Sequence, residues 1–189
     1  MKILFEVLII CLQGILAEKI LFFMPGMPRS SSFTFVPLVH ELVDRGHHVT
    51  IVNPFGTKRQ HANLTQIKIK SIDIQGFMTT FSNLILKPNV TTFEIFKANA
   101  DLLSNVVNNN LPKLLKELDQ EYDFFNKKKF KFDLVICYAM FPNELSFFMP
   151  YYFETQSAFY STMQFSMDFL DEVVGQPHNM AYVPFWCSF

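Results

Sequence analysis

The chain has 189 residues, of which half are hydrophobic and 23 are phenylalanine, and its formal net charge is −1. This length suits one domain with a sizeable core and is too short for two doubly wound domains. A net charge close to zero gives no electrostatic basis for nucleic acid as a partner. No metal-ligand spacing and no phosphate-binding glycine pattern occur, so the sequence predicts no metal and no bound cofactor.

The first 17 residues have the pattern of a secretory signal peptide. Lys2 is followed by an apolar run at residues 3–16, and the small residue Ala17 precedes Glu18. The run is shorter than the ~20 apolar residues that span a bilayer, and no later segment would span one. We therefore expect cleavage after Ala17, a mature chain of residues 18–189 without a transmembrane anchor, and a location in the secretory pathway, either in the endoplasmic reticulum lumen or outside the cell.

The mature chain opens with a strand, a loop, a helix and a second strand. Residues 19–23 are a short apolar strand, and residues 25–32 are expected to form a loop. One stripe at helical spacing follows, made of Phe35, Leu38, Val39, Leu42 and Val43. Gly46 can end this helix in a left-handed conformation, and the β-branched run at 49–52 predicts a strand covered on both faces. The unit predicts an α/β fold with a Rossmann-like parallel sheet flanked by helices.

The rest of the chain predicts further strands and helices. Residues 67–72 alternate as a third strand, residues 132–137 form a fourth, and residues 142–148 begin the helix after it. A helical stripe at residues 102–118 contains Pro112, which predicts a kink or a new helix. Residues 75–101 give no clear pattern.

Two acceptor sequons for N-glycans, Asn63-Leu64-Thr65 and Asn89-Val90-Thr91, are expected on surface loops of a secreted chain. Of the three cysteines, one belongs to the signal segment, which leaves Cys137 and Cys187. Cys137 lies in the fourth predicted strand, so we interpret it as a small buried residue and not as a nucleophile or disulfide partner.

Several blocks together resemble one family. The strand at 19–23, the loop at 25–32, the segment PLVHEL…RGHHVTIVNPF from Pro37 and the strand at 132–136 are similar to the N-terminal half of animal UDP-glycosyltransferases, the glucuronosyl- and glucosyltransferases. The tail at 171–184 resembles a VGxPxNxxYVP stretch of the insect and other invertebrate members. The likeness covers nearly the whole mature chain. It also predicts the strand near residues 158–160, although the sequence there departs from the family.

The resemblance implies the acceptor-binding domain, residues 18–189, of a GT-B protein with two Rossmann-like domains. Such proteins transfer a hexosyl group from UDP-glucose or UDP-glucuronate to small lipophilic acceptors. The UDP-sugar is a co-substrate held mainly by a C-terminal donor domain, whose tryptophan-to-glutamate motif does not occur in these 189 residues. We therefore expect the donor domain to be absent, and the isolated chain not to transfer sugar.

The family's catalytic pair points to the same expectation. Its members use a histidine before the first helix as general base, and an aspartate after the fourth strand to orient it. By register, Ser31 and Tyr138 occupy these two positions. A serine hydroxyl lacks an imidazole-like pKa and cannot act as a general base near neutral pH. The sequence therefore assigns no confident catalytic residue.

Other polar residues have structural interpretations. We expect surface, turn or helix-end positions for the five histidines, with His178 a weak candidate near the acceptor, and simple strand-edge and first-turn roles for Asp133 and Glu144. The basic run at 127–131 is interpreted as a solvated loop. The histidines are His40, His47, His48, His61 and His178.

Three functions stay open from the sequence. The first is the acceptor-binding half of a UDP-glycosyltransferase-like protein. The second is a secreted or luminal binding module for small lipophilic molecules that has lost the catalytic pair. The third is a non-catalytic partner that forms oligomers with active family members.

Overall fold

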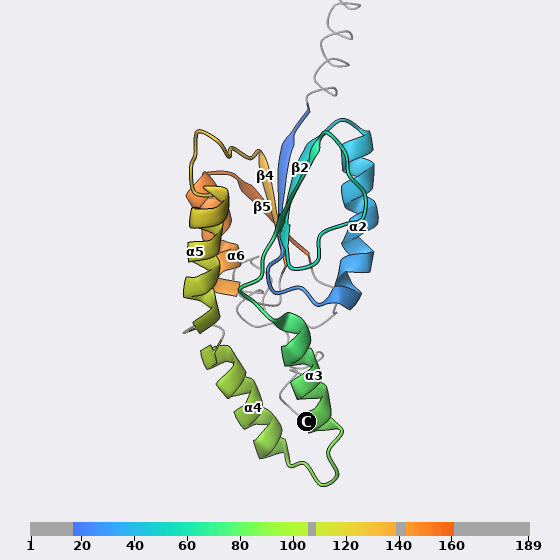
Figure 1. Ribbon diagram of the computed structural model, residues 1–189, viewed down its shortest axis with the longest axis vertical. Helices are drawn as coiled ribbons and strands as arrows, with labels where there is room; N and C mark the ends of the chain where they lie inside the picture. Colours follow the sequence, from blue (N-terminus) through green and yellow to red (C-terminus); the bar gives the residue numbers. More distant parts are fainter. Residues whose placement is uncertain (1–16, 106–108, 139–142, 161–189) are drawn as a thin grey trace, which may run out of the picture.

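The computed structural model (Figure 1) describes residues 17–105, 109–138 and 143–160. Most of the predicted signal segment, the family-like tail at 171–184, His178 and Cys187 lie outside the described residues. None of the described helices is both long and apolar enough to cross a bilayer.

The core of the domain is a sheet of five parallel strands in the order β3-β2-β1-β4-β5. The strands are β1 (Lys19–Phe23), β2 (His48–Asn53), β3 (Leu64–Lys68), β4 (Leu134–Tyr138) and β5 (Gln156–Tyr160). Strand β1 is central, and its last four residues are buried on both faces of the sheet, as expected for a parallel sheet covered by helices. The predicted α/β fold with a Rossmann-like parallel sheet is confirmed, as is the strand near residue 158.

Helices cover both faces of the sheet (Figure 1). Helix α2 (Arg29–Asp44) covers one face, while α5 (Leu111–Tyr122) and α6 (Asn143–Phe153) cover the other. Because successive side chains of a strand point to opposite faces, Ile20 and Phe22 pack in the cluster that contains Phe35 and Val39 of α2. The alternate residues of β1 pack with Leu114 and Leu118 of α5 and with Met149 of α6; they are Leu21 and Phe23.

Helices α3 (Ile74–Ile85) and α4 (Thr92–Asn105) extend beyond the carboxyl-terminal edge of the sheet (Figure 1). The side chain of Asp73 caps α3 by accepting a hydrogen bond from the Gly76 amide at 2.8 Å. Thr91 and Glu94 form a capping box at the start of α4: the Glu94 amide donates to Thr91 Oγ1 at 3.2 Å, and the Thr91 amide donates to Glu94 Oε2 at 2.9 Å. The segment that showed no clear pattern is therefore a pair of capped helices.

Three predicted boundaries were wrong. Residues 29–32 were expected in a loop but form the first turn of α2, which starts directly after Pro28. Strand β3 begins at Leu64, three residues earlier than predicted, and ends at Lys68. It ends there because the carboxylate of Glu117 on α5 accepts the amides of Lys70 and Ser71 at 2.8 and 2.9 Å. Strand β4 runs from Leu134 to Tyr138 instead of 132–137.

The helical predictions had a mixed outcome. A new helix, α5, begins at Leu111, and Pro112 lies in its first turn, where a missing backbone N–H is harmless. The helix expected to begin with residues 142–148 is α6, which the structure describes from Asn143 to Phe153. In the apolar stripe of α2, however, Leu38 is 44% exposed, while Phe35, Val39 and Val43 are buried. The stripe that faces the sheet is thus narrower than the sequence suggests.

Candidate functional site

The candidate site lies where the direction of winding reverses in the sheet. The chain runs from β1 outward through β2 to β3 and then returns to place β4 on the other side of β1. In open α/β sheets, ligands bind outside the carboxyl ends of the strands at this reversal point. The ends of β1 and β4 and the first turn of α2 meet at this edge.

Ser31 and Tyr138 lie together at this point. Ser31 is in the first turn of α2, and Tyr138 is the last residue of β4, with 1% of its surface exposed. The Tyr138 hydroxyl donates a hydrogen bond to Oγ of Ser31 at 3.3 Å, across 107 residues of sequence. The two positions singled out by their register in the sequence are therefore neighbours in space.

Two further hydroxyl groups extend this pair. Thr34, one turn along α2, donates from Oγ1 to the carbonyl oxygen of Ser31 at 2.6 Å. Tyr160, at the end of β5, donates its hydroxyl to Oγ1 of Thr34. The rings of Tyr138 and Tyr160 lie side by side with centroids 6.5 Å apart. We call Ser31, Thr34, Tyr138 and Tyr160 the hydroxyl cluster.

Sequence reasoning missed Thr34 and Tyr160. Thr34 follows Ser31 by three residues, a spacing that places two residues on the same side of a helix, but residues 25–32 were expected to form a loop. Tyr160 ends a strand as Tyr138 does, and the two are register partners across β4 and β5. Only the order of the strands shows that they share one edge.

The hydroxyl cluster offers hydrogen-bonding groups but no general base. Serine, threonine and tyrosine hydroxyls both donate and accept hydrogen bonds, so the cluster suits the polar atoms of a small ligand. None of its four members offers the neutral imidazole or carboxylate that takes a proton near pH 7. The arrangement therefore favours recognition over proton abstraction.

Asn53 is a further buried polar residue at the end of β2. Its Oδ1 accepts the Gly56 amide at 2.6 Å, which forms the turn after the strand. Its Nδ2 is buried and, within the described residues, has no hydrogen-bond acceptor. By strand alternation this side chain is on the same face of the sheet as Ile51, toward α2.

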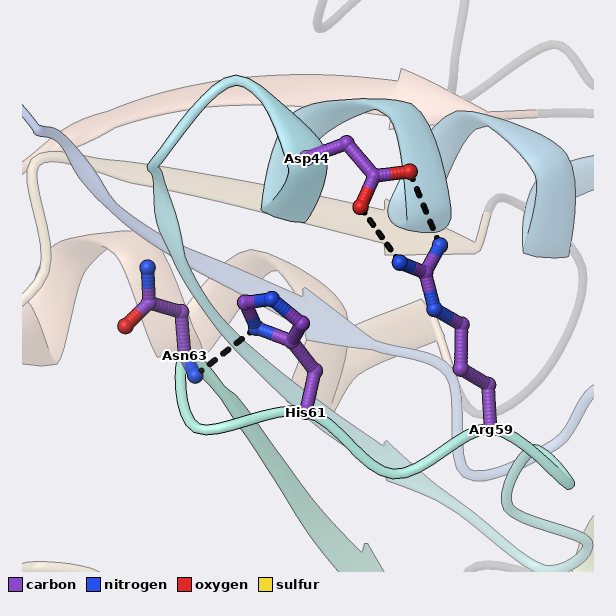
Figure 2. Close-up of polar contacts among 4 residues, drawn as sticks. All are labelled: Asp44, Arg59, His61 and Asn63. Carbon is purple, nitrogen blue, oxygen red and sulfur yellow. Dashed lines mark hydrogen bonds and ion pairs between the residues drawn. The ribbon is translucent and has the colours of Figure 1, made fainter.

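Most of the described histidines lie far from the cluster. His47 Nδ1 accepts the Glu18 amide at 3.2 Å, and His48 starts β2, so both are at the amino-terminal edge of the sheet. His61 Nδ1 accepts the Asn63 amide at 3.1 Å in the turn before β3 (Figure 2). His40 is in the second half of α2, half-buried. The geometry agrees with turn and surface roles for His47, His48 and His61, whereas Nε2 of His40 is buried and, within the described residues, has no hydrogen-bond partner.

The acidic and basic candidates also have structural positions. Asp133 accepts the Lys19 amide at 2.8 Å at the amino-terminal edge, and Glu144 lies in the first turn of α6. In the basic run, Lys127 pairs with Glu154 at 2.7 Å and lies over the ring of Tyr152. The run lies in an exposed loop, as predicted.

An ion pair fixes the connection between β2 and β3 (Figure 2). Arg59 donates through both terminal nitrogens to the carboxylate of Asp44, with Nη1 at 2.9 Å from Oδ2. The hydrogen bond from Arg59 lowers the pKa of Asp44, and the same bond raises the pKa of Arg59. Because α2 ends at Asp44, the pair holds the loop against the end of that helix.

Cys137 is buried on the opposite face of the sheet from Tyr138, in the cluster that contains Leu114 and Phe153. Burial raises the pKa of its thiol to about 12, so almost none of it is thiolate near neutral pH. Its predicted role as a small buried residue is confirmed.

Two open depressions of the described residues lie away from the hydroxyl cluster. An open depression of about 720 Å³ lies at the amino-terminal edge of the sheet, where Glu18, Lys131 and Asp133 line it. Within the described ranges, no group of three or more histidine, cysteine, aspartate or glutamate side chains could hold a metal ion.

Comparison with known proteins gives distant structural likenesses. No protein family matches the sequence, and no curated protein matches it. Among solved structures, the chain is similar to CalG4, the calicheamicin glycosyltransferase, with 17% identity and a TM-score of 0.44 over 89% of this chain and 38% of CalG4. It is also similar to the C-terminal domain of the PF1911 hydrogenase from Pyrococcus furiosus, with 15% identity and a TM-score of 0.37 over 75% of this chain and 89% of that one. Likeness of this degree assigns no function.

Proposed function

We propose that the chain is the acceptor-binding half of a UDP-glycosyltransferase-like protein and is inactive on its own. The full-length family transfers a hexosyl group from UDP-glucose or UDP-glucuronate to small lipophilic acceptors. The observation that carries the proposal is the hydrogen bond between Tyr138 and Ser31. The family motif requires its base and its orienting carboxylate to touch, and here the two matching positions touch although 107 residues separate them.

The position of the pair supports a binding role. It lies at the reversal point of the sheet, next to the hydroxyls of Thr34 and Tyr160 and the half-buried ring of Tyr160, which packs beside the buried ring of Tyr138. Aromatic surface with a few convergent polar groups is typical of small-molecule sites. Such a surface suits a lipophilic molecule with one hydroxyl, which is the acceptor chemistry that the proposal assigns.

The identity of the two residues argues against catalysis by this chain. Abstraction of an acceptor proton needs a base whose pKa lies near the working pH. Ser31 and Tyr138 satisfy each other by a hydrogen bond and supply no such base. This observation favours a second candidate, a binding module for small lipophilic molecules that does not transfer sugar in any context.

Activity of the purified chain tests the first half of the proposal. We expect no release of UDP above a protein-free blank when the chain is incubated with UDP-glucose or UDP-glucuronate and 1-naphthol. Turnover above the blank would contradict the assignment of Ser31 and Tyr138 as non-catalytic replacements.

Binding tests the second half. We expect 1-naphthol to shift nuclear magnetic resonance signals of residues at the hydroxyl cluster. Tyr160→Phe removes one hydroxyl and should weaken binding about fivefold, because one hydrogen bond contributes about 1 kcal/mol. Tyr151→Phe is the matched control, since Tyr151 lies on α6 with 82% of its surface exposed. If Tyr160→Phe and Tyr151→Phe bind 1-naphthol with equal affinity, the ligand does not bind at the hydroxyl cluster.

The glycosyltransferase half and the binding module differ in whether sugar transfer can be restored when a donor domain is joined to the chain. In a chain joined to such a domain, Ser31→His together with Tyr138→Asp should raise transfer more than the two single changes combined, because base and carboxylate act as a unit. Additive gains or no gain would contradict the glycosyltransferase reading and leave the binding module. Sequencing of the full transcript shows directly whether a donor domain follows.

A further inference from the structure

The two sequons of the chain lie in different structural environments. Asn63 is in the turn before β3, and Asn89 is in the turn between α3 and α4. A glycan on a folded protein needs an asparagine whose Nδ2 projects into solvent with room for a sugar. The surroundings of the two side chains therefore decide which of the two asparagines can carry a glycan in the folded chain.

Asn63, in the turn before β3, makes backbone and side-chain hydrogen bonds to its neighbours. Its carbonyl oxygen accepts the Val49 amide at 2.8 Å, which starts the ladder between β2 and β3, and its own amide donates to His61 (Figure 2). The side chain is half-buried, and Nδ2 donates to the carbonyl oxygen of Gly46 at 3.5 Å. The acceptor Asn63 thus lies in a turn, as expected, while Leu64 and Thr65 of the same sequon belong to β3.

Asn89 lies in the turn that joins α3 and α4. It is exposed, and its backbone is left-handed with φ at 63°, a conformation that asparagine tolerates better than most residues. The large apolar residues on either side, Leu86 and Phe93, are 79% and 73% exposed, so the turn is open to solvent. In the part of the chain that the structure describes, no group hydrogen-bonds the Asn89 side chain.

We infer that the folded chain carries an N-linked glycan on Asn89 and none on Asn63. In the transfer, Nδ2 of Asn89 forms a bond to the anomeric carbon of a lipid-linked oligosaccharide. The bond from that carbon to the lipid diphosphate breaks, the lipid diphosphate leaves, and the amide loses one proton. At Asn63 the same step would place a sugar against the end of α2 and the Gly46 carbonyl, and the turn before β3 would have to open.

The inference concerns the fold and the route of secretion and does not depend on acceptor binding. Failure of 1-naphthol binding leaves it intact. Conversely, an unmodified Asn89 says nothing about the hydroxyl cluster.

The test expresses the full 189-residue chain in insect cells, with its own leader and, in parallel, with a secretory leader of known function in front of Glu18. The second arm guarantees translocation even where the native leader fails. The monomeric fraction is treated with an amidase that releases N-glycans, and mass spectrometry locates the resulting aspartate. We expect one glycan, on Asn89, in the second arm. A glycan on Asn63 in the folded monomer, or none on either residue, would overturn the inference.

Three variants separate modification from folding. Thr91→Asp keeps an N-cap residue for α4 but destroys the sequon, so the glycan should be lost while the fold is kept. Asn89→Asp keeps tolerance of the left-handed turn and should also lose the glycan. Thr91→Ser keeps both sequon and cap and should stay modified. Persistence of the glycan in Asn89→Asp would show that another residue carries it.

Discussion

Tyr138 and Tyr160 are register partners at the ends of neighbouring parallel strands, and both direct their hydroxyls to the first turns of the same helix. Tyr138 reaches Ser31, and Tyr160 reaches Thr34. Two strands and one helix are thus tied together at the carboxyl-terminal edge of the sheet. These hydrogen bonds should contribute to the stability of that edge.

The pair of Tyr138 and Ser31 should be coupled in stability. Tyr138→Phe keeps the packed ring and removes only the hydroxyl, so the free energy of unfolding should fall by about 1 kcal/mol, and Ser31→Ala should have a similar effect. The double variant should lose less than the sum of the two, because each single change already breaks the shared bond. Urea unfolding measures all three, with Tyr151→Phe as the neutral control. Strict additivity would show that the two hydroxyls do not interact.

Phe124 should be a main support of the core between the sheet and α5 and α6. It is fully buried and lies against the rings of Phe23, Phe132 and Phe153. Phe124→Ala should lower the free energy of unfolding by about 3–5 kcal/mol, because it removes burial and leaves a cavity. Phe93→Ala, at an exposed position, should change it by less than about 0.5 kcal/mol. Similar losses for both variants in urea unfolding would refute the assignment of this core.

Cys137 should resist alkylation in the native state. Burial raises the pKa of its thiol to about 12, and the reactive thiolate is scarce near pH 8. We expect iodoacetamide to label Cys137 slowly in the native protein and quickly in urea, as read by mass spectrometry of the peptide that contains it. Equal labelling rates in the two conditions would mean that β4 is open or that the thiol is exposed.

The ion pair of Asp44 and Arg59 should make stability depend on pH and salt. The pKa of Asp44 is lowered below 3.8 in the folded chain by its hydrogen bond with Arg59. A lowered folded-state pKa gives a contribution that is present above pH 3.8 and is lost as the pH falls through the folded value.

Arg59→Ala should therefore lower the urea midpoint at pH 7 and have little effect well below pH 3.8. The difference at pH 7 should shrink in high salt, because both groups are partly exposed. Lys58→Ala, at the neighbouring exposed position, is the control. An undiminished effect of Arg59→Ala in acid would show that the side chain stabilises by packing and not by charge.

Local patterns gave the fold class and much of the site. The apolar strand at 19–23, the helix stripe ending before Gly46 and the β-branched run after it are governed by side-chain periodicity, which depends on neighbours in sequence. Pro112 indicated a helix start for a local reason too, because proline has no backbone N–H and is tolerated in the first turn of a helix. The resemblance in sequence singled out Ser31 and Tyr138, which the structure brings to 3.3 Å.

The boundaries that were wrong depended on distant partners. Strand β3 ends where Glu117, more than forty residues away, takes the amides of Lys70 and Ser71. Residues 29–32 join α2 although no periodicity marks them, because burial of Ser32 and the contact of Ser31 with β4 favour a helical turn there. Contacts of this kind leave no trace in a short window of sequence.

The sequence by itself determined that this chain forms a parallel α/β sheet and that neither Ser31 nor Tyr138 can act as a general base. It also determined that Asn63 and Asn89 lie in N-glycosylation sequons. Only the tertiary structure decided that Thr34 and Tyr160 complete the hydroxyl cluster, that Leu38 is largely exposed, and that Asn63 is hydrogen-bonded in the turn before β3 while Asn89 lies in an open turn. The physical reason is that composition and periodicity fix which residues can be buried or bonded, whereas strand order and helix packing fix which partners they meet.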